Sequence, residues 1–290
     1  MFKHLPLSLA ALALLAACSI KDDRLDCLTP VNVHVDGFII SQENLPATKA
    51  DPVAPGSYSA VGAITLAFYD AEGTEVYKTT QLKSDAGAAF GDFSLALRMD
   101  SYTMVAIAHT TKDESPFTLT SPVQAAYTGA HAYETFTCTQ AVDIESTSPV
   151  ELDATLSRVN AMLTVVSTDT KTANATNVRM TLSAGGKSFN PTTGLATVNT
   201  GFSNTVGIST AVGAPSTSST CLFLASDEQT LDVTIEVLDA DGHVLSSKLV
   251  EDVPFRRNRK TKLTGNIYSA PAAGSFLLST GWLSDIEMSF

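Results

Sequence analysis

Positive charge is scarce in this sequence. Lys and Arg together number 18, against 30 Asp and Glu, so the formal net charge is −12 with neutral His. Charged residues of both signs make up 17% of the chain, below the ~25% of a typical soluble domain. Nucleic-acid-binding domains normally present a basic face, and the acidic balance therefore argues against nucleic acid as a partner.

Aromatic residues are also few, at 7% of the sequence with a single Trp. This scarcity does not favour an enzyme with an aromatic-rich pocket. Hydrophobic residues still reach 44%, which argues against wholesale disorder. A chain of 290 residues with many small β-forming side chains predicts two domains or one large all-β domain.

Cysteine occurs only four times, at positions 18, 27, 138 and 221, and no pair has CxxC spacing. No His stands at metal-ligand spacing from any of them, and we predict neither a metal site nor a cofactor. Apart from Cys18, the other three allow one disulfide and one leftover thiol in an oxidising compartment, with Cys27 joined to Cys138 or Cys221. The favoured alternative is that they are buried as small hydrophobic side chains.

The one long apolar run lies at the N-terminus, from Leu5 to Ala17. A membrane span needs about 20 apolar residues, so this shorter run predicts a signal peptide over residues 1–17. It ends in Leu15-Ala16-Ala17-Cys18, and small residues followed at once by Cys resemble the lipobox of bacterial lipoproteins. The resemblance implies cleavage between Ala17 and Cys18 and acylation of Cys18. An ordinary secretory signal with a chance Cys is the alternative.

Residues 18–30 are then expected to form a lipidated tether. Acyl chains on Cys18 would hold the protein in outer-membrane lipid, because each buried CH₂ contributes about 0.8 kcal/mol. The acidic pair Asp22-Asp23 resembles the signal that exports some lipoproteins to the outer face of the outer membrane. A solvated linker is the alternative interpretation of that pair.

Strict alternation of apolar and polar residues dominates the rest of the chain. Such a period of two predicts half-buried antiparallel strands and an all-β fold. The alternation slips by one residue at Ser157-Arg158, which predicts a β-bulge or a strand break there. The clearest runs are Val31, Val33 and Val35; Phe93, Leu95 and Leu97; and Leu231, Val233 and Ile235.

The polar segment 142–151 is the predicted linker between two β-sandwich domains, over residues 31–148 and 149–290. Within them, two predicted hairpins at 64–79 and 233–248 share an Asp-Ala-acid-Gly turn. This likeness indicates either an internal duplication or a turn type that recurs widely.

Two further stretches carry predictions of secondary structure. The segment from Thr192 to Thr220 is rich in Gly, Ser and Thr and predicts long loops between short strands. Pro122 to Phe136 is the one segment with a weak helical pattern, and a short helix is expected there.

No catalytic pattern survives inspection. Gly185-Gly186-Lys187-Ser188 lacks the earlier Gly of a phosphate-binding loop and predicts a β-turn. Asp239-Ala240-Asp241-Gly242 lacks the Glu of an EF-hand and predicts a hairpin turn. The segment 207–211 lacks the second Gly of a nucleophile elbow. We therefore predict that the protein is not an enzyme.

The basic run 256–262 holds five positive charges in seven residues. It indicates either contact with membrane phosphates or an acidic partner, or, as the favoured interpretation, a solvated loop before a strand.

Several segments together resemble the FimB-like fimbrial anchor subunits, which are lipoproteins at the base of protease-matured fimbriae. The matches span nearly the whole chain after the signal peptide, and their order and the lipobox carry the resemblance. The matching segments are Cys18 to Cys27, Ile64 to Gly73, Met99 to Ala108, Leu156 to Leu163, and Val253 to Thr261 with Gly265, Tyr268 and Trp282 beyond it.

The resemblance implies two transthyretin-like antiparallel β-sandwich domains in tandem and no catalytic activity. It implies fimbrial stalk subunits as partners, joined by strand exchange, with the acylated Cys18 fixing the fibre base. In related fimbrillins a basic residue before Ala marks a maturation cleavage. Lys49-Ala50 fits that pattern, and the alternative is therefore a stalk or tip subunit. A surface adhesin that binds glycans or a host protein is the second alternative.

Overall fold

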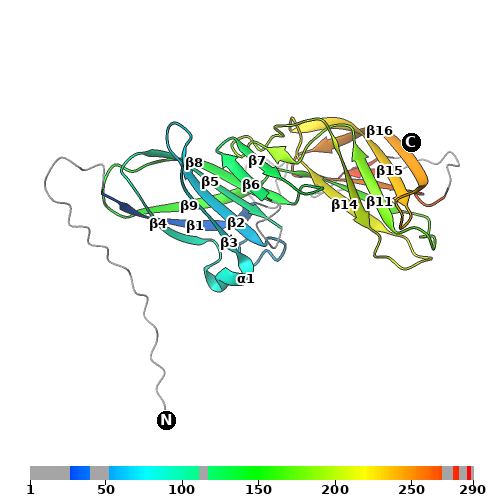
Figure 1. The fold of residues 1–290 in the computed structure, drawn as a ribbon, viewed down its shortest axis with the longest axis horizontal. Helices are drawn as coiled ribbons and strands as arrows, with labels where there is room; N and C mark the ends of the chain where they lie inside the picture. Colours follow the sequence, from blue (N-terminus) through cyan, green and yellow to red (C-terminus); the bar gives the residue numbers. More distant parts are fainter. Residues whose placement is uncertain (1–26, 40–51, 111–116, 270–276, 281–285, 289–290) are drawn as a thin grey trace, which may run out of the picture.

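The computed structural model describes residues 27–39, 52–110, 117–269, 277–280 and 286–288, and they form two halves placed end to end (Figure 1). Over these residues the helical turns are α1 (Lys83–Ala86) and η2 (Gly87–Ala89), and the other regular elements are strands. The all-β prediction is confirmed. Within the same ranges, no helix has the length and apolar character that a membrane crossing requires.

The first half is built on one seven-stranded sheet with the order β3-β2-β5-β8-β9-β1-β4. β8 and β9 pair at only two positions, Phe136 with Arg158 and Thr137 with Ser157, so the sheet divides there into two layers. Valines of β1 and apolar residues of β2 belong to one buried cluster between these layers. The bounds are β1 (Thr29–Ile39), β2 (Ala63–Tyr69), β3 (Glu75–Leu82), β4 (Asp92–Leu97), β5 (Ser101–His109), β8 (Thr135–Asp143) and β9 (Val150–Arg158).

The second half has two sheets, with the orders β14-β10-β17-β18-β19 and β13-β11-β15-β16. Alternate residues of both sheets face one buried cluster, as Leu163 of β10 and Ile235 of β15 illustrate. The bounds are β10 (Ala161–Ser167), β11 (Asn177–Leu182), β13 (Phe202–Gly207), β14 (Thr217–Leu222), β15 (Glu228–Leu238), β16 (Val244–Arg256), β17 (Lys260–Gly265), β18 (Leu277–Thr280) and β19 (Ile286–Met288).

The two halves repeat one topology. β1 lies between antiparallel β4 and parallel β9, and β10 lies in the same way between antiparallel β14 and parallel β17. The facing layers, β3-β2-β5-β8 and β13-β11-β15-β16, also follow the chain in the same order. The hairpins of similar sequence are β2-β3 and β15-β16, which occupy different places in this repeat. Their likeness therefore reflects turn chemistry rather than duplication of that hairpin.

The passage between the halves lies later than the sequence predicts. Residues 142–151 hold the end of β8, an exposed turn and the start of β9, and β9 pairs with β1 in the first sheet. The structure thus moves the expected division at 148 to residues 159–160, because a polar segment fits an exposed turn as well as a linker. The strand break predicted at Ser157-Arg158 is confirmed, since β9 ends at Arg158 and β10 begins at Ala161.

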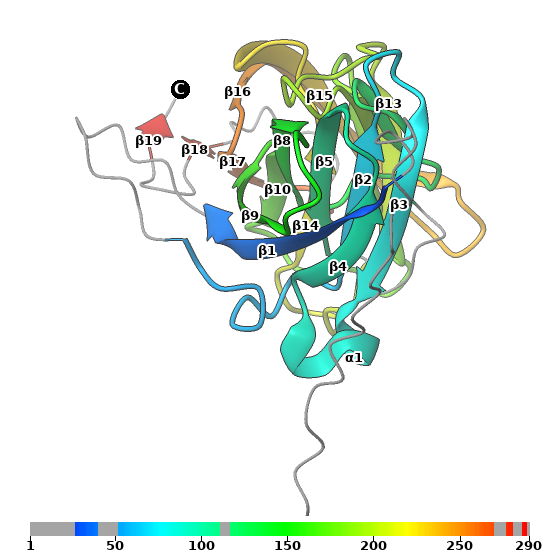
Figure 2. The ribbon, with the colours of Figure 1, turned by 90° about the vertical axis from the view of Figure 1, so that its left-hand side faces the viewer.

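A third sheet joins the halves. It consists of β6 (Phe117–Ser121), β7 (Gln124–Tyr127) and β12 (Ser188–Phe189), with β12 supplied by the second half. The helix expected over Pro122–Phe136 is absent: Ala125 and Tyr127 of β7 point with a period of two into a buried cluster that also holds Phe223 of the second half. Figure 2 looks along the molecule from the first half, with β1 and β4 in front.

Candidate functional site

The site residues predicted from the sequence lie on both sides of β1. Ala17 and Cys18 precede it, Lys49 and Ala50 follow it, and all four lie outside the described residues. The two predicted processing events would therefore determine whether β1 stays joined to the membrane anchor and to the rest of the chain. For this reason β1 is the candidate functional site.

The inward face of β1 is apolar from Val31 to Val35. Val31, Val33 and Val35 are 0–1% exposed, because each alternate residue of the strand points into the core of the first half. Hydrogen-bonded neighbours lie on both sides of β1, with Val33 opposite Phe93 of β4 and Leu152 of β9. The strand is thus a central member of its layer, and its removal would leave two rows of backbone groups without partners.

The outward face of β1 carries polar cross-strand pairs. The side-chain amide of Asn32 donates from Nδ2 to Glu151 Oε1 of β9 at 2.8 Å, and Ser94 Oγ of β4 donates to Asn32 Oδ1 at 2.9 Å. His34 Nδ1 lies 2.5 Å from Asp92 Oδ1 of β4, and this hydrogen bond raises the pKa of His34. These pairs tie β1 to both neighbours, although their solvent exposure makes each contribution small.

The C-terminal end of β1 is fixed by the chain that returns after the segment 40–51. Phe38 and Val53 exchange both backbone hydrogen bonds, at 2.9 and 3.0 Å. A Cβ on Gly37 would stand 2.7 Å from the Val53 carbonyl oxygen, so only glycine permits this close approach.

A buried ionic cluster stands where the chain leaves the first half. Arg158 Nη2 lies 2.5 Å from Glu134 Oε1, and the two side chains are only 2% and 12% exposed. The guanidinium carbon is also 5.0 Å from the ring centre of Phe136. Tyr58 completes the cluster, since its hydroxyl donates to Glu134 Oε1 at 2.8 Å and accepts from Arg158 Nη2 at 3.2 Å.

The second half contributes Asn258 to this cluster. Arg158 Nη1 donates to Asn258 Oδ1 at 3.0 Å, and the amide of Asn258 donates to the Asn160 carbonyl at 3.0 Å. Asn258 is buried in the left-handed region, with φ 58°, in the turn between β16 and β17. The basic run 256–262 is therefore a turn and a strand, and Arg257 pairs with Asp227 at 2.7 Å.

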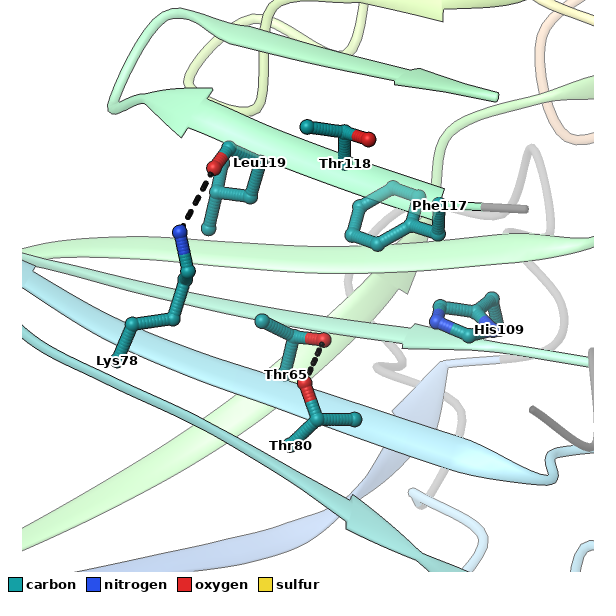
Figure 3. A pocket seen from close by; sticks show the side chains of 7 residues that line it. All are labelled: Thr65, Lys78, Thr80, His109, Phe117, Thr118 and Leu119. Carbon is teal, nitrogen blue, oxygen red and sulfur yellow. Dashed lines mark hydrogen bonds between the residues drawn. The ribbon is translucent and has the colours of Figure 1, made fainter. Parts of the chain in front are cut away.

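A cavity of about 290 Å³ lies on the outer face of β2, β3 and β5, beneath β6 (Figure 3). Its paired threonines and its lysine are bonded within the protein. Thr65 and Thr80 share a hydrogen bond of 2.9 Å, and Lys78 Nζ donates to Glu75 Oε2 and to the Leu119 carbonyl, at 2.6 and 3.2 Å. The ring centre of buried His109 lies 4.8 Å from that of Phe117, with the two rings tilted by 44°. Because these lining groups already bind one another, we interpret the cavity as a gap in packing between β6 and the sheet.

The two similar turns have the same hydrogen bonds. Asp239 Oδ1 accepts from the amides of Asp241 and His243, at 3.0 and 2.8 Å, and Asp70 accepts in the same way from residues 72 and 74. The hairpin-turn prediction is confirmed. Asp239, Asp241 and His243 also place one ligand-type atom each within 4.8 Å of one another. The turn amides already donate to the Asp239 carboxylate, and these hydrogen bonds lower its pKa. The turn therefore explains why these three side chains lie close together.

The β-turn expected at residues 185–188 is not formed. Gly185 has φ 80°, Gly186 exchanges backbone hydrogen bonds with Phe223, and the chain then enters strand β12 rather than a helix. Cys138 and Cys221 are free thiols, so Cys27 pairs with neither. Burial raises the pKa of Cys221 to about 12, and its thiol is therefore unreactive at neutral pH.

Sequence reasoning missed the cluster at the passage between the halves. Tyr58, Glu134, Arg158 and Asn258 lie far apart in the chain and meet only in the fold. One signal was present: Arg158 and Asn160 interrupt the apolar run from Leu156 to Leu163 and are both buried.

Comparison with known proteins gives one family and a set of similar folds. A model of a family of unknown function, DUF6562, matches residues 63–288. A comparison with curated proteins gives no match.

Three solved structures resemble the fold over most of the chain. The fimbrial anchor protein Mfa2 from Porphyromonas gingivalis has a TM-score of 0.52 at 13% identity, covering 91% of this chain and 100% of that one. A candidate adhesin from Bacteroides ovatus has 0.53 at 12%, covering 90% and 95%. A candidate polysaccharide-binding protein (DUF1812) from Bacteroides thetaiotaomicron has 0.51 at 11%, covering 89% and 98%. At these identities the likeness is one of fold.

Proposed function

This chain belongs to the family of unknown function DUF6562, and we propose that it serves at the cell surface as a non-catalytic fimbrial anchor subunit of the FimB-like kind. Its two halves are tandem β-sandwich domains of the transthyretin-like type. Cys18 carries the acyl chains that hold it in the outer membrane, and residues up to Cys27 form the tether. The similar fold of a fimbrial anchor protein supports this role.

The observation that carries the proposal is the central position of β1. Val31, Val33 and Val35 are buried, and β1 has a hydrogen-bonded strand on each side. A subunit attached through Cys18 keeps β1 joined to its own tether, so the membrane anchor and the core of the first half are one covalent unit. Cleavage at Lys49-Ala50 would remove the anchor and the strand together.

Fimbrial stalk subunits are the proposed partners, joined by strand exchange. In the described residues β19 stands at the end of the order β14-β10-β17-β18-β19, with β18 as its one paired neighbour there. An extended strand from a stalk subunit can add to such an edge through main-chain hydrogen bonds, while alternate side chains give specificity.

Purification of the native protein from outer membranes tests this role. We expect fimbrial subunits to co-purify with the wild-type protein from the membrane fraction. The Cys18→Ala variant should leave the membrane fraction while still co-purifying with the same subunits, because the lipid and the partner surface are separate. Recovery of the wild-type protein from membranes with host glycans or host proteins, and without fimbrial subunits, would instead support the adhesin alternative.

A further inference from the structure

At the C-terminal end of β1, Phe38 packs on Tyr58, whose hydroxyl reaches the passage between the halves. The Phe38 ring centre lies 6.0 Å from that of Tyr58 and 5.0 Å from that of Phe136. Tyr58 and Phe136 are in turn 5.7 Å apart, nearly perpendicular to each other. Phe38 and Phe136 are fully buried, so the three rings hold one another in place.

The same Tyr58 side chain is bound to the buried ion pair. Its hydroxyl touches both Glu134 and Arg158, at 2.8 and 3.2 Å. Burial and the neighbouring Glu134 raise the pKa of Tyr58, so the hydroxyl stays protonated and remains a donor. The position of the Tyr58 ring, which Phe38 sets, therefore decides whether Glu134 keeps both of its partners.

Arg158 carries this contact into the second half. It is bonded to Asn258 Oδ1 at 3.0 Å, and Asn258 is held by the Asn160 carbonyl in the turn before β17. A buried charge that is left without a partner carries a large free-energy cost. Loss of one contact in such a network therefore favours rearrangement of the others. Phe38 and Asn258 are thus joined by an unbroken series of contacts through Tyr58 and Arg158.

We infer that β1 and the junction between the halves form one conformational unit. In this unit, the packing of Phe38 against Tyr58 determines how rigidly Arg158 holds the turn at Asn258. A chain with β1 in place has a rigid junction. A chain in which β1 is displaced has a loosened junction and two halves that move relative to each other. The inference goes beyond the proposed function and holds whether or not Cys18 is acylated.

Amide hydrogen exchange on the full chain tests this coupling. We expect Phe38→Leu to speed exchange of the amides at 256–262 by about tenfold, although the substitution lies in the other half. Phe93→Leu is the matched control, because Phe93 is buried in the same core but lies on β4. It should leave exchange at 256–262 unchanged. Equal effects of the two variants, or no effect of Phe38→Leu, would overturn the inference.

A second pair of variants keeps the test decisive if Phe38→Leu does not fold. Tyr58→Phe removes one hydroxyl and retains the three rings, and we expect it to speed exchange at 256–262 as well. Tyr102→Phe removes a hydroxyl that donates to the Arg98 carbonyl and should have no effect there. Combining Tyr58→Phe with Asn258→Ala should add nothing to Asn258→Ala alone, because both act through Arg158; independent, multiplicative effects would contradict the coupling.

Discussion

The two halves of the molecule place their first strands in the same position, but only the first strand of the first half lies between predicted processing sites. β1 and β10 are each flanked by one antiparallel and one parallel strand. The chain on both sides of β10 is bonded to the protein: Asn160 precedes it, and Asp169 after it accepts the amides of residues 267–269. β1 is likewise bonded at its described ends, where Thr29 Oγ1 donates to the Ser146 carbonyl and Phe38 pairs with Val53, but it stands between the two predicted processing sites, Cys18 and Lys49-Ala50.

This difference indicates that the first half holds the link between the proposed anchor and the folded core. Both halves have the same topology, and in the second half the first strand is an internal part of the chain. In the first half the equivalent strand is the link between the proposed membrane anchor and the core. The stability that β1 gains from its neighbouring strands, and from the packing of its own Phe38 on Tyr58 and Phe136, is therefore the property to measure.

The largest expected effect contrasts two Arg–Glu pairs, one from each half. Arg158→Met should lower the free energy of unfolding by about 3–5 kcal/mol, because it leaves Glu134 buried without its cation. Arg179→Met, which breaks the pair with Glu236, should cost about 0–1 kcal/mol, since Arg179 is 34% exposed. Urea denaturation of the two variants measures the contrast, and similar losses would show that the junction pair has no special weight.

Truncation of core residues compares the two first strands directly. Leu163→Ala in β10 should cost about 2–5 kcal/mol. Val33→Ala in β1 should cost less, because fewer buried atoms are removed. Leu249→Ala is the control, since Leu249 is 59% exposed and its truncation should stay within about 0.5 kcal/mol. If Val33→Ala proves neutral in thermal unfolding, β1 is not part of the core in solution.

A smaller effect is expected at Gly37. Gly37→Ala places a Cβ 2.7 Å from the Val53 carbonyl oxygen, and we expect a loss of about 1–3 kcal/mol from this overpacking. Gly207→Ala in β13 is the matched control, because its nearest neighbour would be 3.9 Å away. A neutral Gly37→Ala in denaturant titrations would mean that residues 52–53 do not pack on β1.

The smallest effect concerns pH. The hydrogen bond with Asp92 raises the pKa of His34 above its ordinary value of 6.5. Protonated His34 therefore stabilises the fold fully below pH 6.5, and this contribution is lost as the pH rises through the raised pKa. It amounts to a few tenths of a kcal/mol at this exposed site. The pH profile of unfolding for His34→Gln should lack this step, and an unchanged profile would assign it to another group.

The alternation of apolar and polar residues was sufficient to predict the all-β fold and several strands. Val31 to Val35 and Leu231 to Val237 lie in strands with that face buried. The same pattern misplaced the division between the halves, because polar residues at 142–151 suit an exposed turn as well as a linker. The helix expected at Pro122–Phe136 failed because β7 gains its burial from Phe223, a distant residue.

The candidate site was only partly predictable. The processing motifs drew attention to both flanks of β1, and its alternating valines predicted a buried strand. The parallel pairing of β1 with β9 and the cluster at Arg158 depend on contacts across about 100 residues of chain, which spacing in a sequence does not specify.

N-terminal mass spectrometry of the protein recovered from the cell surface tests the central claim most directly. We expect the mature chain to begin at Cys18, to carry acyl chains on that residue, and to be continuous through Lys49-Ala50 into β2. A thioether at Cys18 also requires that its sulfur form no disulfide. A mature chain that begins at Ala50, or an unacylated Cys18 joined to Cys27, would contradict the account of a subunit anchored through the tether of β1.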